Sequence, residues 1–321
     1  MEPFQLDSLP VLSRSTVERE EGLREDTRRQ RELWQDGRVI VVDKYARTPI
    51  RSGGTVLAHR PATGDEPPAD ALLLGEEKGV GYWGLLVEAE APREVIDWRA
   101  WQEIGDNDGE QWLDLRGAGS FLDATSAGLF TTAVALTGWH ARAKFCARCG
   151  SVVNRVKAGW ATHCTGCGRE EYPRTDPAVI CLVHDREGVN GSQVLLARQP
   201  IWPKGRYSVL AGFVEAGESL EACVAREIAE EVGVDVGDIR YLGSQPWPFP
   251  RSLMLGFAAS ADPAQPLKLA DGEIEEAHWV PRAVVQEALA AEADGTAHWL
   301  GLPGPTSIAR RMLESWTSSS S

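Results

Sequence analysis

The 321-residue sequence lacks any run of 18 or more apolar residues, and its first ten residues have neither a basic start nor an apolar stretch. The first absence predicts that no segment spans a membrane. The second predicts that no secretory signal stands there, so we expect a cytoplasmic protein. Basic charge is also scarce, because 33 Lys and Arg face 47 Asp and Glu, for a net charge of −14. Such a chain is a poor non-specific DNA binder, since that binding depends on a net basic surface.

Cysteine is infrequent, and four of the six cysteines stand in two close pairs, Cys146-x2-Cys149 and Cys164-x2-Cys167. Two such knuckles complete a tetrahedral Zn²⁺ site, and four thiolates leave no position open for water. The spacing therefore predicts one structural zinc ion. Two redox pairs are the alternative, but the thioredoxin-like context that they need is absent. The remaining cysteines, Cys181 and Cys223, are expected to be buried small apolar residues.

Acidic residues are missing from 124–169, a stretch that holds six basic ones. A Zn(Cys)₄ centre carries a formal charge of about −2, so local charge balance explains part of this excess. The alternative that stays open is a patch that faces an anion or RNA. The six residues are Arg142, Lys144, Arg148, Arg155, Lys157 and Arg169.

Strand-like runs alternate with helical patterns along most of the chain. The runs at 38–42, 71–74 and 82–89 are β-branched or apolar and are bounded by turn residues. Helical patterns are expected at 15–35, 120–139, 220–232, 282–292 and 307–316. This mixture predicts an α/β (α+β) protein. We expect an N-terminal α/β domain at 1–140, a Cys₄ zinc ribbon at 141–172 and a C-terminal mixed domain at 173–321.

The segment GFVEAGESLEACVAREIAEEVGV at 212–234 predicts a helix that Ser219 caps and Gly233 ends. At about 100° per residue, Glu231 falls inside the apolar stripe that faces the core. A carboxylate there is costly unless something neutralises it, and Glu227 and Glu230 crowd the neighbouring face. Shared divalent cations would remove both costs, and all-oxygen ligation favours Mg²⁺ or Mn²⁺ over zinc. The stripe consists of Leu220, Val224, Ile228 and Val232.

Proline is concentrated in one short string, SQPWPFPRS at 244–252. Each proline fixes its own φ near −65° and disfavours helical geometry for the residue before it. The string is therefore expected to be nearly extended, with Trp247 and Phe249 on one side. A linker or a peptide ligand is the alternative, but the string stands between a helix and a strand-like run. Because rigid side chains lose little entropy when a flat base docks, we interpret it as a preformed wall of a nucleotide site.

The helix segment resembles the Nudix box, G-x5-E-x7-R-E-U-x-E-E-x-G-U with U aliphatic, and fills every fixed position. The resemblance implies that 173–321 is a Nudix hydrolase domain, an α/β/α sandwich that cleaves a nucleoside diphosphate linked to a further group. It implies that Arg226 orients a glutamate of the box and that Glu218 helps to hold the loop. The implied Mg²⁺ or Mn²⁺ ligands are Glu227, Glu230, Glu231 and the backbone carbonyl of Ala211. The matching residues are Gly212, Glu218, Arg226, Glu227, Ile228, Glu230, Glu231, Gly233 and Val234.

The zinc module directly before this box and the SQPWPFPxS string after it resemble the NudC-type NAD(H) pyrophosphatases. The similarity spans 141–316 well and covers 1–140 only in general layout, where that family carries a divergent Nudix-like domain. It implies hydrolysis of NADH or NAD⁺ to NMNH or NMN and AMP, and removal of NAD caps from RNA 5′ ends. It also implies a homodimer in which each site is built partly from the partner chain.

The substrate contacts of that family carry over to matching positions of this sequence. Phe213 and Tyr172 match aromatic residues that sandwich the nicotinamide, and Ala309 matches a backbone contact. Glu273 matches a metal-binding carboxylate outside the box, with Glu276 as the nearby alternative. The string contributes Gln245, Pro246, Trp247, Pro248, Phe249, Pro250, Arg251 and Ser252.

Two positions depart from the family pattern. An acidic contact that some members place five residues before the third cysteine is Gly159 here, and Arg116 is the candidate for an N-terminal basic contact. Two alternatives stay open for function. One is a Nudix hydrolase for ADP-ribose or a dinucleoside polyphosphate, which would not need the proline string. The other is a zinc-ribbon RNA-binding protein with an inactive Nudix domain, against which the three intact glutamates of the box argue.

Overall fold

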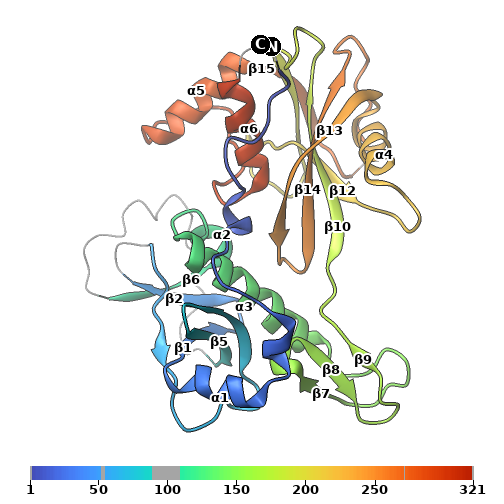
Figure 1. Cartoon of the computed structure of the whole chain (residues 1–321). Coiled ribbons are helices and arrows are strands. Elements are labelled where there is room, and N and C mark those ends of the chain that lie inside the picture. Colours follow the sequence, from blue (N-terminus) through green and yellow to red (C-terminus); the bar gives the residue numbers. More distant parts are fainter. Residues whose placement is uncertain (1, 52–54, 89–108, 271, 320–321) are drawn as a thin grey trace. The chain divides into compact units, whose positions relative to one another are not determined.

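The chain divides into two compact units in the computed structural model, which describes residues 2–51, 55–88, 109–270 and 272–319 (Figure 1). Unit 1 comprises Met1–Pro10, Asp176–Gln245 and Ser252–Ser321, and unit 2 comprises Val11–Thr175 and Pro246–Arg251. Both units combine strands and helices, which confirms the expected fold class. None of the helices in the described part of the chain has the length and apolar character that crossing a bilayer requires.

A six-stranded mixed sheet forms the centre of unit 1, in the order β13-β14-β10-β11-β15, with β12 paired to β10. β10 runs parallel to β14 and antiparallel to β11 and β12. The strands are β10 (Asp176–His184), β11 (Gln193–Arg198), β12 (Leu210–Phe213), β13 (Val236–Trp247), β14 (Ser252–Ala261) and β15 (Glu276–Pro281).

Helices cover both faces of this sheet because successive residues of a strand point to opposite sides. Val179, Cys181 and Val183 of β10 pack with α4 (Leu220–Val232), whereas Ile180 and Leu182 pack with α6 (Ile308–Ser318). α5 (Arg282–Ala293) packs beside α6, and Figure 1 shows this pair across the sheet from α4. The arrangement is the α/β/α sandwich that the Nudix resemblance implies.

The first ten residues belong to unit 1. Phe4 is 4% exposed and lies in the same apolar cluster as α6. Its backbone N–H donates to Asn190 Oδ1 at 2.7 Å, and its carbonyl accepts from Arg240 Nη1 at 3.3 Å. The N-terminal segment is therefore held to unit 1 by the backbone N–H and carbonyl of Phe4 and by burial of the Phe4 ring.

Unit 2 has a four-stranded sheet in the order β3-β1-β5-β4 and a separate β2–β6 pair. α3 (Ala124–Arg142) supplies much of its main core, and it begins where Asp123 accepts a hydrogen bond from Ser126 N. The other elements are η1 (Val11–Ser13), η2 (Glu21–Arg24), α1 (Thr27–Gln35), β1 (Arg38–Asp43), β2 (Arg47–Arg51), β3 (Arg60–Pro61), β4 (Leu72–Glu77), β5 (Val80–Val87), β6 (Glu110–Asp114) and α2 (Leu115–Ala118).

The helix expected at 15–35 is wrong in its first half. α1 begins at Thr27, because Asp26 accepts a hydrogen bond from Arg29 N and so caps the helix there. Within 15–26 only the short η2 is helical. The strand expected at 82–89 is present as β5 and ends at Val87, while residue 89 lies outside the described residues.

The cysteine module is a three-stranded antiparallel sheet in the order β7-β8-β9. A tight turn, η4 (Lys157–Gly159), joins its first two strands. The strands are β7 (Val153–Val156), β8 (Ala161–Cys164) and β9 (Glu170–Glu171).

Candidate active site and zinc centre

α4 has the bounds that its sequence predicts. Ser219 accepts a hydrogen bond from Ala222 N at 3.2 Å, and Gly233 ends the helix in the left-handed conformation with φ 72°. Cys223, Val224, Ile228 and Val232 are buried against the sheet. The carboxylates of the helix are therefore held on a rigid, well-capped element.

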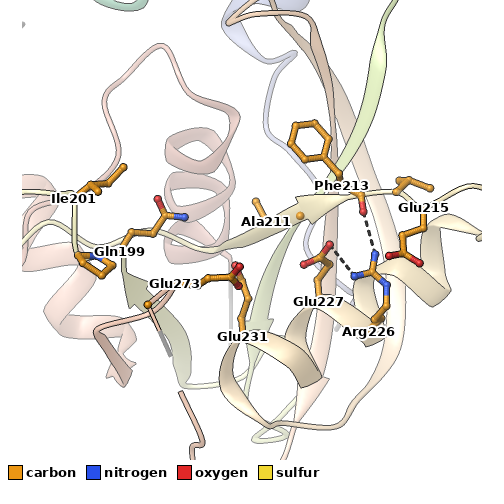
Figure 2. A pocket seen from close by; sticks show the side chains of 13 residues that line it. Gln199, Ile201, Ala211, Phe213, Glu215, Arg226, Glu227, Glu231 and Glu273 are labelled. Carbon is orange, nitrogen blue, oxygen red and sulfur yellow. Dashed lines mark hydrogen bonds and ion pairs between the residues drawn. The ribbon is translucent and has the colours of Figure 1, made fainter. Parts of the chain in front are cut away.

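Four carboxylates line a pocket of about 500 Å³ in unit 1: Glu215, from the loop before α4, and the three candidate metal ligands Glu227, Glu231 and Glu273 (Figure 2). Glu227 and Glu231 come from α4, and Glu273 comes from the segment before β15. Ala211 of β12, whose carbonyl is the expected metal ligand, also lines the pocket. Glu230 is not among the pocket's lining residues and is exposed.

Glu231 is the most constrained of these carboxylates. It is only 7% exposed, and its Oε2 atom is buried without a hydrogen-bond partner within the described structure. Burial, with smaller contributions from Glu227 and Glu273, raises the pKa of Glu231 to about 8. A buried carboxyl oxygen without a donor fits a hard divalent cation, which prefers oxygen ligands and would offset the cost of burying the charged carboxylate.

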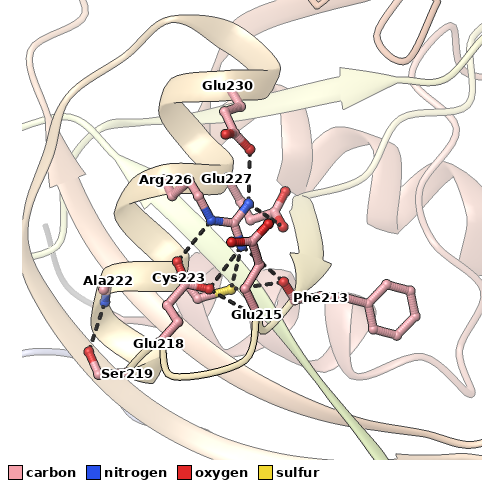
Figure 3. A network of polar contacts seen from close by, with 9 residues as sticks. All are labelled: Phe213, Glu215, Glu218, Ser219, Ala222, Cys223, Arg226, Glu227 and Glu230. Carbon is pink, nitrogen blue, oxygen red and sulfur yellow. Dashed lines mark hydrogen bonds and ion pairs between the residues drawn. The ribbon is translucent and has the colours of Figure 1, made fainter.

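Arg226, which lines the pocket, is also the hub of a polar network (Figure 3). Its Nε and Nη2 atoms donate to the two oxygens of Glu218 at 2.8 and 2.9 Å. Its Nη1 atom donates to Glu227 at 3.0 Å and to Glu230 at 2.9 Å, and Nη2 also donates to the Phe213 carbonyl at 3.0 Å. The guanidinium lowers the pKa of Glu218 to about 2, so this carboxylate stays charged and anchors the loop before α4.

Gly212 lets the backbone of β12 lie directly against Glu227. A Cβ atom built on Gly212 would stand 1.8 Å from Glu227 Cδ and 2.1 Å from both of its oxygens. Position 212 therefore requires glycine because the backbone lies so close to the Glu227 side chain. Backbone conformation is not the reason, since the φ of Gly212 is not in the left-handed region. Sequence reasoning recognised this glycine only as part of the box.

The segment that carries Glu273 is tied to the end of α4. Lys268 N donates to the Val232 carbonyl and Ala270 N to the Glu231 carbonyl, each at 2.9 Å. Glu276, the alternative candidate, lies on β15 instead, where it accepts from Arg198 at 3.2 Å and from the Tyr207 hydroxyl. The structure therefore brings Glu273, and not Glu276, to the pocket with Glu227 and Glu231.

The remaining candidate contacts are distributed between the two units. Phe213 lines the pocket and is 58% exposed, and Tyr172, 51% exposed, belongs to unit 2. Ala309 is 1% exposed near the start of α6, and its N–H donates to Ser307 Oγ at 3.2 Å. Gln245 is fully buried and donates to the Thr306 carbonyl at 3.0 Å, which links β13 to the segment before α6.

The proline string contributes its centre, Pro246–Arg251, to unit 2. Trp247 and Phe249 pack against the core of that unit and contact each other edge to face, with ring centroids 5.0 Å apart. Arg116 stacks on Phe249, with its guanidinium carbon 4.0 Å from the ring centroid. The two rings are neighbours as expected, although the extended backbone gives way to a turn after Trp247. Ser252 begins β14.

The four paired cysteines form the expected metal centre. Their sulfur atoms all lie within 4.8 Å of one another, with 3.7 Å between Cys146 and Cys167 and 3.4 Å between Cys149 and Cys164. Zn–S bonds of about 2.3 Å in a tetrahedron place sulfur atoms about 3.8 Å apart, so the cluster fits Zn²⁺. Cys181 and Cys223 are buried in unit 1, as expected.

Several of the basic residues in 124–169 have partners. Lys157 pairs with Glu25 and Glu170, and Arg169 pairs with Glu171. Arg155 donates to the Asp70 carbonyl and Arg142 to the Gly138 carbonyl. These contacts leave the proposal of an RNA-facing patch without direct support.

Sequence reasoning missed one side of the pocket. Gln199, Pro200 and Ile201, which follow β11, line it, and Ile201 is 86% exposed. Arg198 holds this turn by donating to the Gln199 and Trp202 carbonyls. No motif marks these residues, because their place follows only from the way β11 and β15 pair.

Comparison with known proteins gives consistent matches along the chain. Family models match for a NADH pyrophosphatase-like rudimentary NUDIX domain at 31–139, a NADH pyrophosphatase zinc ribbon domain at 141–172 and a NUDIX domain at 174–300. The chain is 44% identical over 317 residues to the NAD-capped RNA hydrolase NudC of Mycobacterium bovis (strain BCG / Pasteur 1173P2), covering 98% of this chain and 96% of that protein. It is 38% identical over 212 residues to the protein of that name from Stutzerimonas stutzeri, covering 65% and 70%. A NUDIX hydrolase crystal structure from Nitrosomonas europaea matches at 23% identity and a TM-score of 0.35, covering 50% of this chain and 98% of that one.

Proposed function

Because this chain belongs to the NudC family of NAD-capped RNA hydrolases, we propose that it hydrolyses the pyrophosphate bond of NADH and NAD⁺ and removes NAD caps from RNA 5′ ends. The free dinucleotides give NMNH or NMN with AMP, and capped RNA gives NMN with a 5′-monophosphate RNA. The observation that carries the proposal is the pocket where Glu227, Glu231 and Glu273 meet and where one buried oxygen of Glu231 has no donor.

The chemistry of pyrophosphate cleavage suits this arrangement. Mg²⁺ or Mn²⁺ would be held by Glu227, Glu231, Glu273 and the Ala211 carbonyl, which line the pocket. The metal would neutralise phosphate charge and lower the pKa of the attacking water. Arg226 contributes by fixing Glu227 and Glu230 in place through charged hydrogen bonds. Gly212 contributes by letting the β12 backbone approach Glu227.

Recognition of the dinucleotide is assigned to aromatic and proline-rich surfaces. Phe213, at the pocket rim, and Tyr172 flank the nicotinamide, and Ala309 contributes a backbone contact. The string 245–252 forms a wall of the nucleotide site, which the packing of Trp247 and Phe249 supports because it fixes both rings before binding. We assign the active form as a cytoplasmic homodimer. Its cysteine-only metal centre is compatible with a reducing compartment, where thiols persist.

Product analysis tests this function. Purified protein incubated with NADH and Mg²⁺ or Mn²⁺ is expected to give NMNH and AMP in equal amounts, resolved by chromatography, and NAD-capped RNA is expected to give NMN. ADP-ribose and a dinucleoside polyphosphate serve as competing substrates in the same assay. Turnover of either in the absence of NMNH would contradict the assignment and favour another Nudix substrate.

Replacing Gly212 with alanine is expected to lower kcat/KM for NADH about 100-fold, because a displacement of about 1 Å at a reacting group has an effect of that size. The added Cβ cannot coexist with Glu227 at its present position. Gly304→Ala is the matched control, since a Cβ there meets no atom within 4 Å. Wild-type kinetics for Gly212→Ala would show that Glu227 need not stand against β12.

A further inference from the structure

The turn between β7 and β8 has an unusual backbone. Lys157, Ala158 and Gly159 are all left-handed, with φ of 53°, 51° and 90°. This conformation is costly for residues that carry a Cβ, and it persists only where the surroundings enforce it. Two consecutive non-glycine residues in this state therefore call for an explanation beyond the closing of a hairpin.

Packing and hydrogen bonds around Gly159 hold the turn in this shape. The Gly159 carbonyl lies 2.7 Å from Nε2 of the buried His140, and Trp160 Nε1 donates to the Leu73 carbonyl at 2.7 Å. A Cβ built on Gly159 would stand 2.3 Å from Leu72 Cδ2, so the turn presses directly on Leu72. The same contact disfavours any larger side chain at 159, including a carboxylate.

This turn directs the Lys157 side chain to Tyr172, the residue that directly follows β9. Lys157 Nζ lies 3.4 Å from the Tyr172 hydroxyl and 5.6 Å from its ring centroid. The Tyr172 hydroxyl donates to Glu170 Oε2 at 2.9 Å, and Lys157 pairs with that oxygen at 3.5 Å. Glu25 fixes the ammonium from another side at 2.9 Å. The charged groups of Lys157 and Glu170 thus both contact the phenol oxygen of Tyr172.

The ring so held is not part of the core. Tyr172 is 51% exposed, whereas the Lys157 side chain is only 18% exposed. An exposed tyrosine ordinarily keeps its rotamer freedom and loses it when a ligand orders the ring. Two charged partners on the hydroxyl remove that freedom in advance and leave the ring available for a flat group.

We propose that Lys157 and Glu170 are positioning residues that hold the Tyr172 ring for the nicotinamide of the substrate. The inference rests on the proposed function, which assigns Tyr172 to this ring. Glu170 thereby places a carboxylate beside the β7–β8 turn. A carboxylate side chain at position 159 of that turn would collide with Leu72.

Steady-state kinetics with NADH, at saturating Mg²⁺, test the proposal on the full-length protein. Tyr172→Ala is expected to raise KM by about 10-fold or more, and Tyr172→Phe, Glu170→Gln and Lys157→Met by about 3- to 10-fold each, with kcat unchanged. The double variant Tyr172→Phe/Glu170→Gln is expected to match Tyr172→Phe alone, because the charge of Glu170 acts on the ring through its hydrogen bond with the Tyr172 hydroxyl, which Tyr172→Phe already removes. Lys157→Arg is expected to restore a near-native KM.

Control and contrary outcomes separate this inference from the proposed function. Glu171→Gln, which removes the partner of Arg169 on the same strand, is expected to leave KM unchanged, and zinc content and Tm are expected to stay at wild-type values in all variants. A raised KM for Tyr172→Ala with native KM for Tyr172→Phe and Glu170→Gln would overturn the positioning role alone. An unchanged KM for Tyr172→Ala, or additive effects in the double variant, would overturn it as well. Of these outcomes, only an unchanged KM for Tyr172→Ala would also remove Tyr172 from the proposed substrate site.

Discussion

Glu231→Gln is expected to lower kcat for NADH by about 100- to 1,000-fold, because a catalytic metal supplies several kcal/mol and about 1.4 kcal/mol corresponds to tenfold in rate. The metal-free variant is expected to be as stable as the wild type or more stable. Glu231 is 7% exposed, lacks a partner for Oε2 and has its pKa raised to about 8, so the wild-type site disfavours its charge. A neutral amide avoids the cost of burying that charge.

Activity and thermal stability measured on the same preparations check this result. Wild-type protein is expected to gain Tm when Mg²⁺ or Mn²⁺ is added, since a ligand that binds only the folded state stabilises it, and the variant is expected to gain little. Glu221→Gln is the matched control, because it removes the same charge from an exposed position in the first turn of α4. Loss of stability in metal-free Glu231→Gln, or retained turnover, would show that Glu231 serves the fold and not the metal.

Cys164→Ser is expected to abolish stoichiometric zinc binding and to lower Tm by about 10 °C or more, given about 2–4 °C per kcal/mol and a structural zinc site worth several kcal/mol. The module has little apolar core to compensate, because Phe145 and Val152 are 63% and 56% exposed while Cys146 and Cys164 are buried. Metal ligation must therefore supply much of its folding free energy.

Metal analysis and inhibition kinetics distinguish a structural from a catalytic role for this zinc ion. Cys181→Ser, at a buried cysteine outside the cluster, is expected to keep one zinc per chain even if its stability falls. A zinc-selective chelator, applied with Mg²⁺ in excess, is expected to inactivate the enzyme with time in a way that raised NADH does not reverse. Competitive inhibition, or full stability without zinc, would contradict the structural assignment.

Sequence reasoning succeeded where the determining interactions are local. The bounds of α4 follow from Ser219 and Gly233, and the zinc centre follows from two CxxC turns whose spacing alone brings four sulfur atoms together. It failed at 15–26, where a highly charged run was taken for helix. The cap that starts α1 is the single side chain of Asp26, and the apolar residues that this helix buries, Leu33 and Trp34, stand near its end.

The sequence by itself determined the chemistry of this protein: a helix that carries glutamates in the Nudix pattern, a cysteine-ligated metal module and a rigid aromatic string. Only the tertiary structure decided that Glu273, and not Glu276, reaches the pocket, and that Gly212 is needed because β12 touches Glu227. It also decided that Arg116 stacks on Phe249 and that Lys157 and Glu170 hold Tyr172. Most of these contacts join residues far apart in the chain or on different elements, and strand pairing and packing bring such residues together in ways that local sequence patterns do not encode.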